Sequence, residues 1–242
     1  MKTFDGDFNY FLDKIISSEH YALSRWGDGE LRILQNKFID LRNKKNGEFR
    51  YDPKLDEYKR LKKKLELSYT SRDDEYYIGV ACPCCRGQNQ YKYMKKKSQQ
   101  DEGHLTWANL FVNANYRRFV NEFIPEMRNH DVVMVVNNQA DTSLLPFDVE
   151  KTYKVGPDAW NKDYDVIDQI KDDHLGSRDK VFLFAAGPLA NILTYELWFH
   201  MNKNNTYIDI GSTLDVQMGM KPTRGYQPGY PTSKYTHRVC VW

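Results

Sequence analysis

Two carboxylates separated by one glycine, Asp28-Gly29-Glu30, are the residues whose types and spacing most directly suggest chemistry. If this segment is extended, side chains at positions i and i+2 point the same way, and both carboxylates can face one cation. Carboxylate oxygens together with water suit Mg²⁺ or Mn²⁺ better than zinc. Such an ion would bridge a diphosphate and neutralise the charge that grows as a nucleotide departs. The alternative interpretation is an exposed acidic turn.

The residues around this motif could assist in binding phosphate. Gly27 and Gly29 mark a turn, and Gly29 lets the backbone come close to a ligand. Arg25 could hold phosphate oxygens with its forked guanidinium, or it could form a salt bridge with a neighbouring carboxylate. Gly187-Pro188 opens a predicted helix whose N-terminus would attract anions, although proline is also simply a good first residue for a helix.

Asparagines at two further places are candidate ligand contacts. Asn109 and Asn113 lie one turn apart in a helix that we expect from Thr106 to about residue 124, so they can share a face. They could bind a sugar or uracil, or they could make structural hydrogen bonds. Asn137 ends a buried strand, where asparagine either turns the chain or contacts a ligand.

Two aspartates are candidates for a general base. Asp158 follows Gly156-Pro157, and Asp215 follows Gly211, so each comes shortly after a glycine at the end of a predicted strand. Either carboxylate could remove a proton from an acceptor hydroxyl.

Apolar strands alternate with helices along the chain. Strands are expected at 21–24, 76–81, 131–136, 152–155, 181–185 and 207–210, and helices at 4–18, 54–67, 106–124, 163–170 and 188–201. This pattern predicts an α/β, Rossmann-like fold: a mainly parallel sheet with helices on both faces. Ligands of such sheets bind beyond the carboxyl ends of the strands, so we expect the candidate residues to share one rim.

Composition narrows the possible functions. The chain has 242 residues, of which 40% are hydrophobic, so it can form a sizeable core. Its formal net charge of +2 gives no reason to expect nucleic acid as a partner. It has no signal peptide and no long apolar run, so we expect a cytoplasmic protein without a transmembrane segment. We expect one domain over residues 1–217, with a loop-rich tail over 218–242 packed on it.

Two clusters lie outside the candidate site. Cys82, Cys84 and Cys85 could bind zinc with Cys240 or a histidine as fourth ligand, but their crowded spacing favours buried, inert thiols. Four lysines with Tyr91 and Tyr93 form a basic patch, Lys92, Lys95, Lys96 and Lys97. It could touch anionic lipid at a membrane surface or a phosphorylated acceptor, although a solvated loop is the favoured interpretation.

Four blocks in this order resemble the glycosyltransferases of the GT-D type, formerly a domain of unknown function. They are SRWGDGE at 24–30, HLTWANLFVNANY at 104–116, YKVGPDAWNKDYDVI at 153–167, and VFLFAAGPLANILTYEL followed by YIDIGSTLD at 181–215. The resemblance implies that Asp28 and Glu30 contact a metal and a nucleotide diphosphate. It also implies that the 104–115 block, Gly156, Gly187 and Pro188 line the donor site. Trp26 and Ser212 depart from the family, which commonly has phenylalanine and histidine there.

The resemblance implies a hexosyl- or pentosyltransferase that uses Mn²⁺ or Mg²⁺, with a UDP-sugar donor and a glycan or lipid-linked acceptor. Two rival functions use the same residues. One is a metal-dependent phosphohydrolase or nucleotidyl enzyme, and the other is a non-catalytic module that binds nucleotides or carbohydrates. The sequence leaves open whether the reaction inverts or retains the anomeric configuration.

Overall fold

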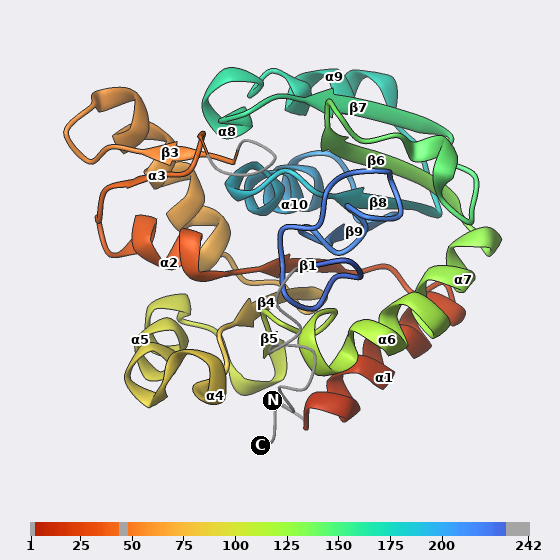
Figure 1. The fold of residues 1–242 in the computed structure, drawn as a ribbon, viewed down its shortest axis with the longest axis horizontal. Coiled ribbons are helices and arrows are strands. Elements are labelled where there is room, and N and C mark those ends of the chain that lie inside the picture. The colour runs from red at the N-terminus through yellow and green to blue at the C-terminus, as the bar shows by residue number, and fades with distance from the viewer. Residues whose placement is uncertain (1–2, 44–47, 231–242) are drawn as a thin grey trace.

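A seven-stranded parallel sheet forms the centre of the computed structural model of this protein, which describes residues 3–43 and 48–230 (Figure 1). Its strand order is β5-β4-β1-β9-β8-β6-β7, and its pairings are parallel. The strands are β1 (Ala22–Arg25), β4 (Tyr76–Val80), β5 (Leu105–Trp107), β6 (Asp131–Asn137), β7 (Lys151–Val155), β8 (Lys180–Phe184) and β9 (Thr206–Asp209). Among residues 3–43 and 48–230, the first and last strands, β1 and β9, are therefore neighbours near the middle of the sheet.

Helices cover both faces of this sheet (Figure 1). One face carries α2 (Asp28–Leu34), α3 (Asp56–Thr70), α5 (Gln88–Ser98), α8 (Ala159–Lys162), α9 (Val166–Asp173) and α10 (Pro188–His200). The other face carries α1 (Phe4–Ile16) and a run of short helices, α6 (Tyr116–Arg118), a π-helical turn (Phe119–Phe123) and α7 (Ile124–Glu126). The predicted α/β fold is confirmed.

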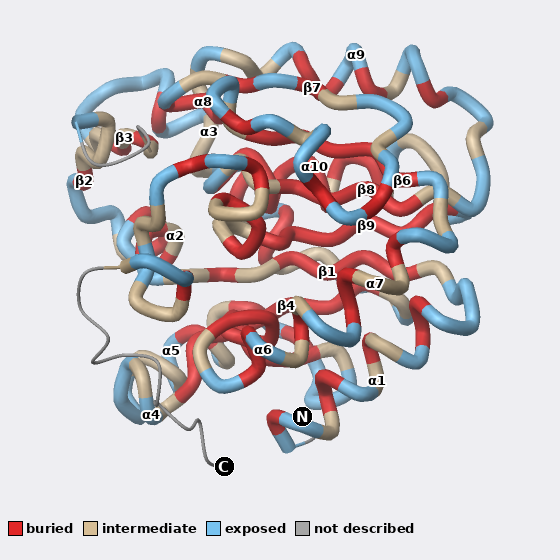
Figure 2. The backbone as a smooth tube through the Cα atoms, turned by 45° about the vertical axis from the view of Figure 1, so that its right-hand side comes forward, coloured by how far each residue is buried: buried red, intermediate tan, exposed pale blue. Residues whose placement is uncertain are grey.

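The alternation of side chains along each strand explains why two separate cores form. Val133 and Val135 of β6 pack into the core under α3 and α10, whereas Val132 and Met134 pack into the core under α1. Both faces of the strand are buried, as Figure 2 shows for the central strands. This double burial is the reason that β6 is apolar throughout in the sequence.

The six predicted strands are confirmed to within one residue at each end, and the structure has three further short strands that the sequence pattern does not indicate. These are β5 and the antiparallel pair β2 (Ile39–Asp40) and β3 (Arg50–Tyr51). The predicted start of a helix at Thr106 is wrong, because Thr106 lies within β5. Its hydroxyl donates a hydrogen bond to Asp7 at 3.0 Å and caps no helix.

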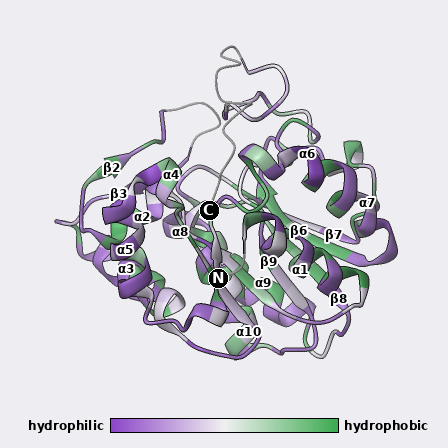
Figure 3. Ribbon diagram, turned by 90° about the horizontal axis from the view of Figure 1, so that it is seen from below, coloured by the Kyte–Doolittle hydropathy of each residue, from purple (hydrophilic) through white to green (hydrophobic). Residues whose placement is uncertain are grey.

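The basic segment that we expected to be a solvated loop is the helix α5. Only Met94 and Ser98 of this helix are buried, so no apolar stripe marks it in the sequence, and Figure 3 shows it as largely hydrophilic. Glutamine and lysine favour helix without packing. Lys97 pairs with Glu66 at 3.1 Å, and Lys95 pairs with Glu102, so part of the basic charge is matched by neighbouring carboxylates.

The described part of the C-terminal segment, residues 218–230, contains no helix or strand. Met218 and Met220 are nevertheless buried in the core under α1. Cys240 and the rest of 231–242 lie outside the described residues. Of the helices in the described ranges, none has both the length and the apolar character needed to cross a lipid bilayer.

Candidate functional site

The carboxyl ends of the parallel strands share one rim, as the sequence analysis predicted. At the end of β1 the chain turns at Gly27, which is the N-cap residue of α2, and Asp28-Gly29-Glu30 forms the first turn of that helix. The extended backbone that would point both carboxylates the same way is therefore absent, whereas the turn that the two glycines indicated is present. Successive helical residues are rotated by about 100°, so Asp28 and Glu30 leave the backbone in different directions. Glu30 turns back and accepts a hydrogen bond from the Gly27 N–H at 3.0 Å.

The two carboxylates of the motif have different surroundings. Asp28 is exposed and forms an ion pair with Arg86 at 2.6 Å. Arg86 belongs to α4 (Pro83–Arg86), the short helix that follows β4. Burial raises the pKa of Glu30 to about 8, and the negative charges of Asp209 and Asp28 contribute to this increase. The surroundings of Glu30 therefore oppose the ionisation of its carboxyl group.

Asp209 is a site residue that the sequence analysis did not single out. It ends β9, which lies directly beside β1, and it is buried. Burial raises its pKa to about 6, an effect that Arg25 partly offsets. Its carboxylate accepts hydrogen bonds from the backbone N–H groups of Arg25 at 3.2 Å and Gly211 at 2.9 Å. The signal in the sequence was an aspartate at the end of the last strand, but its position beside Glu30 depends on the strand order.

Arg25 joins three parts of the rim. Its Nε donates to the carbonyl of Ala108 at 2.7 Å, and its Nη1 donates to the carbonyl of Ile210 at 2.9 Å. The guanidinium also lies over the ring of Phe111, 5.5 Å from its centre. Within the described ranges it forms no salt bridge with Asp28 or Glu30, so that alternative is wrong. Two of its donors hold backbone carbonyls, and a phosphate could reach only the remaining Nη2, which lies beside Gly211.

Phe49 covers the starts of two helices on the rim. A Cβ atom added to Gly29 would lie 2.5 Å from Cζ of this ring, and one added to Gly187 would lie 3.5 Å from Cδ1. Gly29 is buried by this contact, so its missing side chain makes room for a phenylalanine ring and leaves no open approach for a ligand at that atom. The predicted helix start at Gly187-Pro188 is confirmed, with Gly187 at a φ of +56°.

Asn191 fixes the start of α10 against the end of β1. It is fully buried, and its amide donates to the hydroxyl of Ser24 at 3.0 Å and the carbonyl of Arg25 at 2.9 Å. The indole of Trp26 donates to the same hydroxyl at 3.0 Å. These bonds hold the N-terminus of α10 beside the turn that carries the acidic motif.

The predicted asparagines do not share a helix face. Asn109 lies in the loop after β5, and Asn113 begins a 3₁₀ turn with a φ of +53°. Asn137 ends β6, and its side-chain oxygen accepts the N–H of Gln139 at 2.9 Å, which turns the chain. At the end of β7, the N–H of Gly156 donates to Asp163 at 2.8 Å.

Asp158 serves as a structural anchor. It is buried, and its carboxylate accepts hydrogen bonds from the Arg50 N–H at 2.9 Å, the Tyr58 hydroxyl at 2.7 Å and the Trp160 indole at 3.1 Å. These bonds join β3, α3 and α8. Both carboxylate oxygens are engaged, so the geometry argues against Asp158 as a general base.

Asp215 lies in the loop after β9, among groups from the C-terminal segment. It is buried, and its negative charge acts on Tyr226, whose pKa is raised to about 12 mainly by burial. The Tyr226 hydroxyl lies 3.0 Å from that of Ser212, and its ring lies 4.9 Å from that of Tyr116. Arg224 forms an ion pair with Glu48 at 2.9 Å. Residues 224–227 therefore join the β9 loop to the segment beside Phe49.

Three solved structures share this fold. One is described as "The highly conserved domain of unknown function 1792 has a distinct glycosyltransferase fold", with a TM-score of 0.58 and 14% identity, over 97% of this chain and 88% of that one. "A New Glycosyltransferase (DUF1792) from Streptococcus sanguinis" has a TM-score of 0.58 and 14% identity, over 97% of this chain and 91% of the other. A selenomethionine-substituted structure of the same domain has a TM-score of 0.57 and 13% identity, over 97% and 88% of the two chains.

No protein-family model matches the chain, and a search of curated proteins gave no significant match. At this level of identity the three structures establish the fold. The chain thus has the architecture that is described, for the first of these structures, as a distinct glycosyltransferase fold.

Proposed function

We propose that this protein is a glycosyltransferase that moves a sugar from a UDP-sugar to a hydroxyl group of a glycan or lipid-linked acceptor. The observation that carries the proposal is that Glu30, in the first turn of α2 after β1, lies close enough to Asp209 at the end of β9 for the charge of Asp209 to raise its pKa. Burial is the main cause of the raised pKa values of these two carboxyl groups, and a bound cation would favour their ionised forms. The likeness to structures described as glycosyltransferases, over 97% of the chain, supports the same function.

The donor atoms at this rim fit a hard divalent cation, Mn²⁺ or Mg²⁺. Carboxylate oxygens are the ligands that these ions prefer, and a cation would relieve the burial of negative charge on Glu30 and Asp209. Asp28 and Glu30 leave α2 in different directions, so to hold one ion together Asp28 would release Arg86 and turn its carboxylate towards Glu30. When bound, the ion would hold the donor's diphosphate and neutralise the charge on the departing nucleotide.

The protein's own groups would orient the donor. Gly187 is the N-cap residue of α10, whose free N–H groups and dipole favour anions. Arg25 holds the loops after β5 and β9 in place, and the charge it brings acts next to Asp209. Asp215 is the remaining candidate for the base that accepts the proton of the acceptor hydroxyl, because Asp158 is fully occupied by structural hydrogen bonds.

Product analysis with a panel of nucleotide hexoses and pentoses, with and without Mn²⁺, tests this proposal. We expect nucleotide release coupled to sugar transfer, and a loss of about 10²-fold in turnover for Glu30→Gln. The matched control is Glu57→Gln, an exposed glutamate in the first turn of α3. Phosphate release without sugar transfer would indicate a phosphohydrolase instead. Metal-independent binding of UDP without turnover would indicate a binding module.

A further inference from the structure

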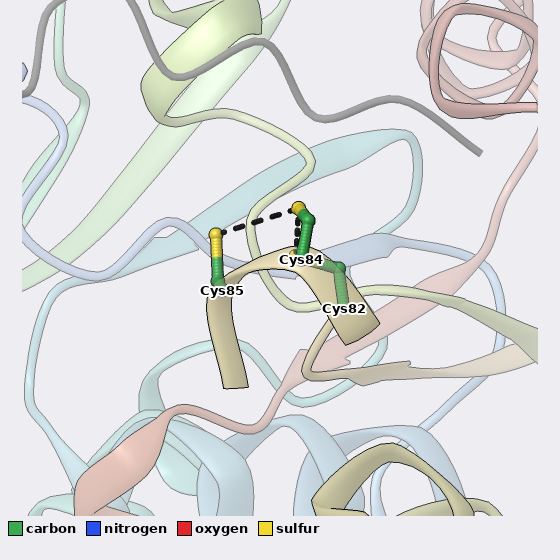
Figure 4. Close-up of side chains that lie close together, drawn as sticks. All are labelled: Cys82, Cys84 and Cys85. Carbon is green, nitrogen blue, oxygen red and sulfur yellow. Dashed lines mark hydrogen bonds between the residues drawn. The ribbon is translucent and has the colours of Figure 1, made fainter. Parts of the chain in front are cut away.

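Three cysteines after β4 bring their sulfur atoms together. Cys82 is the N-cap residue of α4, and Cys84 and Cys85 lie within that helix. Figure 4 shows the three side chains grouped at this turn. The Sγ atoms of Cys82 and Cys84 are 3.2 Å apart, those of Cys84 and Cys85 are 3.8 Å apart, and all three lie within 4.8 Å of one another.

The Cys84–Cys85 distance equals the separation of two sulfur ligands on one metal ion, and the Cys82–Cys84 distance is shorter than that separation by about 0.6 Å. Thiolates bound to one tetrahedral zinc at about 2.3 Å lie about 3.8 Å from each other. A disulfide would need a sulfur–sulfur distance of about 2.05 Å. The close C-x-C-C spacing favoured inert thiols in the sequence. In the structure, the same spacing brings the three sulfur atoms to about the separation of ligands around one metal ion. The prediction of buried thiols is also wrong for two of the three, because Cys84 is exposed and Cys85 is half-buried.

We propose that Cys82, Cys84 and Cys85 bind one thiophilic cation, Zn²⁺ in the first instance, at a site distinct from the carboxylates of the rim. Soft thiolate ligands select zinc over Mg²⁺ and Mn²⁺, whereas the rim offers only hard oxygens. The two sites would therefore take different metals. Three protein ligands leave the fourth tetrahedral position for another donor, and exposure of Cys84 gives the ion a path to the site.

The surroundings of the three thiols support such a site. Cys82 is buried and packs in a small cluster with Phe4 and Trp107, so one ligand is held on a rigid base. The amide of Asn113 points at the sulfur of Cys85 from 4.0 Å. An N–H donor directed at a ligand sulfur is the kind of contact that orients and stabilises a bound thiolate.

The proposed ion would act on the candidate active site through one helix turn. Arg86 follows Cys85 directly, and it pairs with Asp28 at 2.6 Å. A metal that fixes α4 would fix the position of Arg86 and so the partner of Asp28. The thiol site would then stabilise the form of the acidic motif in which Asp28 pairs with Arg86, without touching the donor.

Cobalt spectroscopy on the full, reduced chain tests the assignment. One equivalent of Co²⁺ should produce thiolate-to-cobalt charge-transfer absorption in the near ultraviolet, and one equivalent of Zn²⁺ should abolish it. Cys84→Ser and Cys85→Ser should each lose this absorption, whereas Glu30→Gln, which alters only the carboxylate site, should keep it. Absence of the absorption in the wild-type chain, or its retention in both serine variants, overturns the proposal.

A second measurement uses the wild-type chain alone and is unaffected by any folding defect of the variants. Alkylation of each cysteine by iodoacetamide is followed by mass spectrometry with and without Zn²⁺. We expect zinc to slow labelling of the exposed Cys84 by about tenfold or more, because the bound thiolate is no longer available as a nucleophile. Equal labelling rates with and without zinc would show that no ion binds these sulfurs.

Discussion

The charge on Glu30 should make the protein less stable as the pH rises, and replacement of Glu30 by glutamine should remove that effect. Glutamine has nearly the same shape as glutamate, and its amide oxygen can still accept the hydrogen bond from the Gly27 N–H. The substitution therefore removes a titrating carboxyl group and preserves the cap at the start of α2. It isolates the electrostatic contribution of one side chain.

The direction and size of the effect follow from the pKa of Glu30. Its pKa is raised from an ordinary 4.5 to about 8, so the folded protein holds this proton more tightly than the unfolded chain does. The resulting stabilisation is complete below about pH 4.5 and is lost as the pH rises towards 8. The full shift gives about 3 kcal/mol between about pH 5 and pH 7.5. Because Glu30 is only partly buried, we expect about half of that, ~1.5 kcal/mol.

Urea denaturation in EDTA at these two pH values measures the effect for wild type, Glu30→Gln and the control Glu57→Gln. The free energy of unfolding of Glu30→Gln, relative to wild type, should increase by about 1.5 kcal/mol between the lower and the higher pH. Glu57 is exposed, and its substitution should give the same difference at both values. If Glu30→Gln also differs from wild type by a constant amount, burial of a charge at Glu30 is refuted.

Two further substitutions test the packing of the site. Gly29→Ala should lower the free energy of unfolding by about 1 kcal/mol, despite alanine's higher helix propensity, because the new Cβ meets the Phe49 ring at 2.5 Å. Gly103→Ala, where a Cβ meets open space, is the control, and equal melting temperatures for the two variants would contradict the clash. Asp158→Asn should cost about 2 kcal/mol, because it replaces a charged acceptor of three hydrogen bonds. The control is Asp179→Asn, because the exposed Asp179 also has a positive φ, which asparagine tolerates. A comparable loss of unfolding free energy in Asp179→Asn would refute a special role for the Asp158 carboxylate.

The long apolar runs made much of the fold predictable. The run of β6 is buried on both faces, and Pro188 marks the start of α10, so these elements could be located from local residues alone. The strand β5 has only three residues, too few for a periodic pattern. The helix α5 has one buried apolar side chain, Met94, so periodicity could not identify it.

The candidate site was only partly predictable, because some of its geometry depends on contacts between distant residues. The helical turn at Asp28 could have been recognised from Glu30, three residues after the capping Gly27, which is the spacing of a capping box. By contrast, no local pattern reveals that Asp209 lies beside Glu30 or that Phe49 fills the space at Gly29. Those contacts follow from the strand order and from a hairpin of two-residue strands.

The pairing of β1 with β9 has a consequence for how the protein acquires activity during synthesis. The backbone N–H of Arg25 bonds to the carboxylate of Asp209, 184 positions later in the chain. Closing so long a loop is slow, and it cannot occur while the ribosome still holds the last strand. A nascent chain that has built β1, β4 and β5 therefore has the acidic turn in place but lacks half of the rim. The complete rim, and with it any binding of the proposed donor, should appear in a single late step, when β9 inserts between β1 and β8.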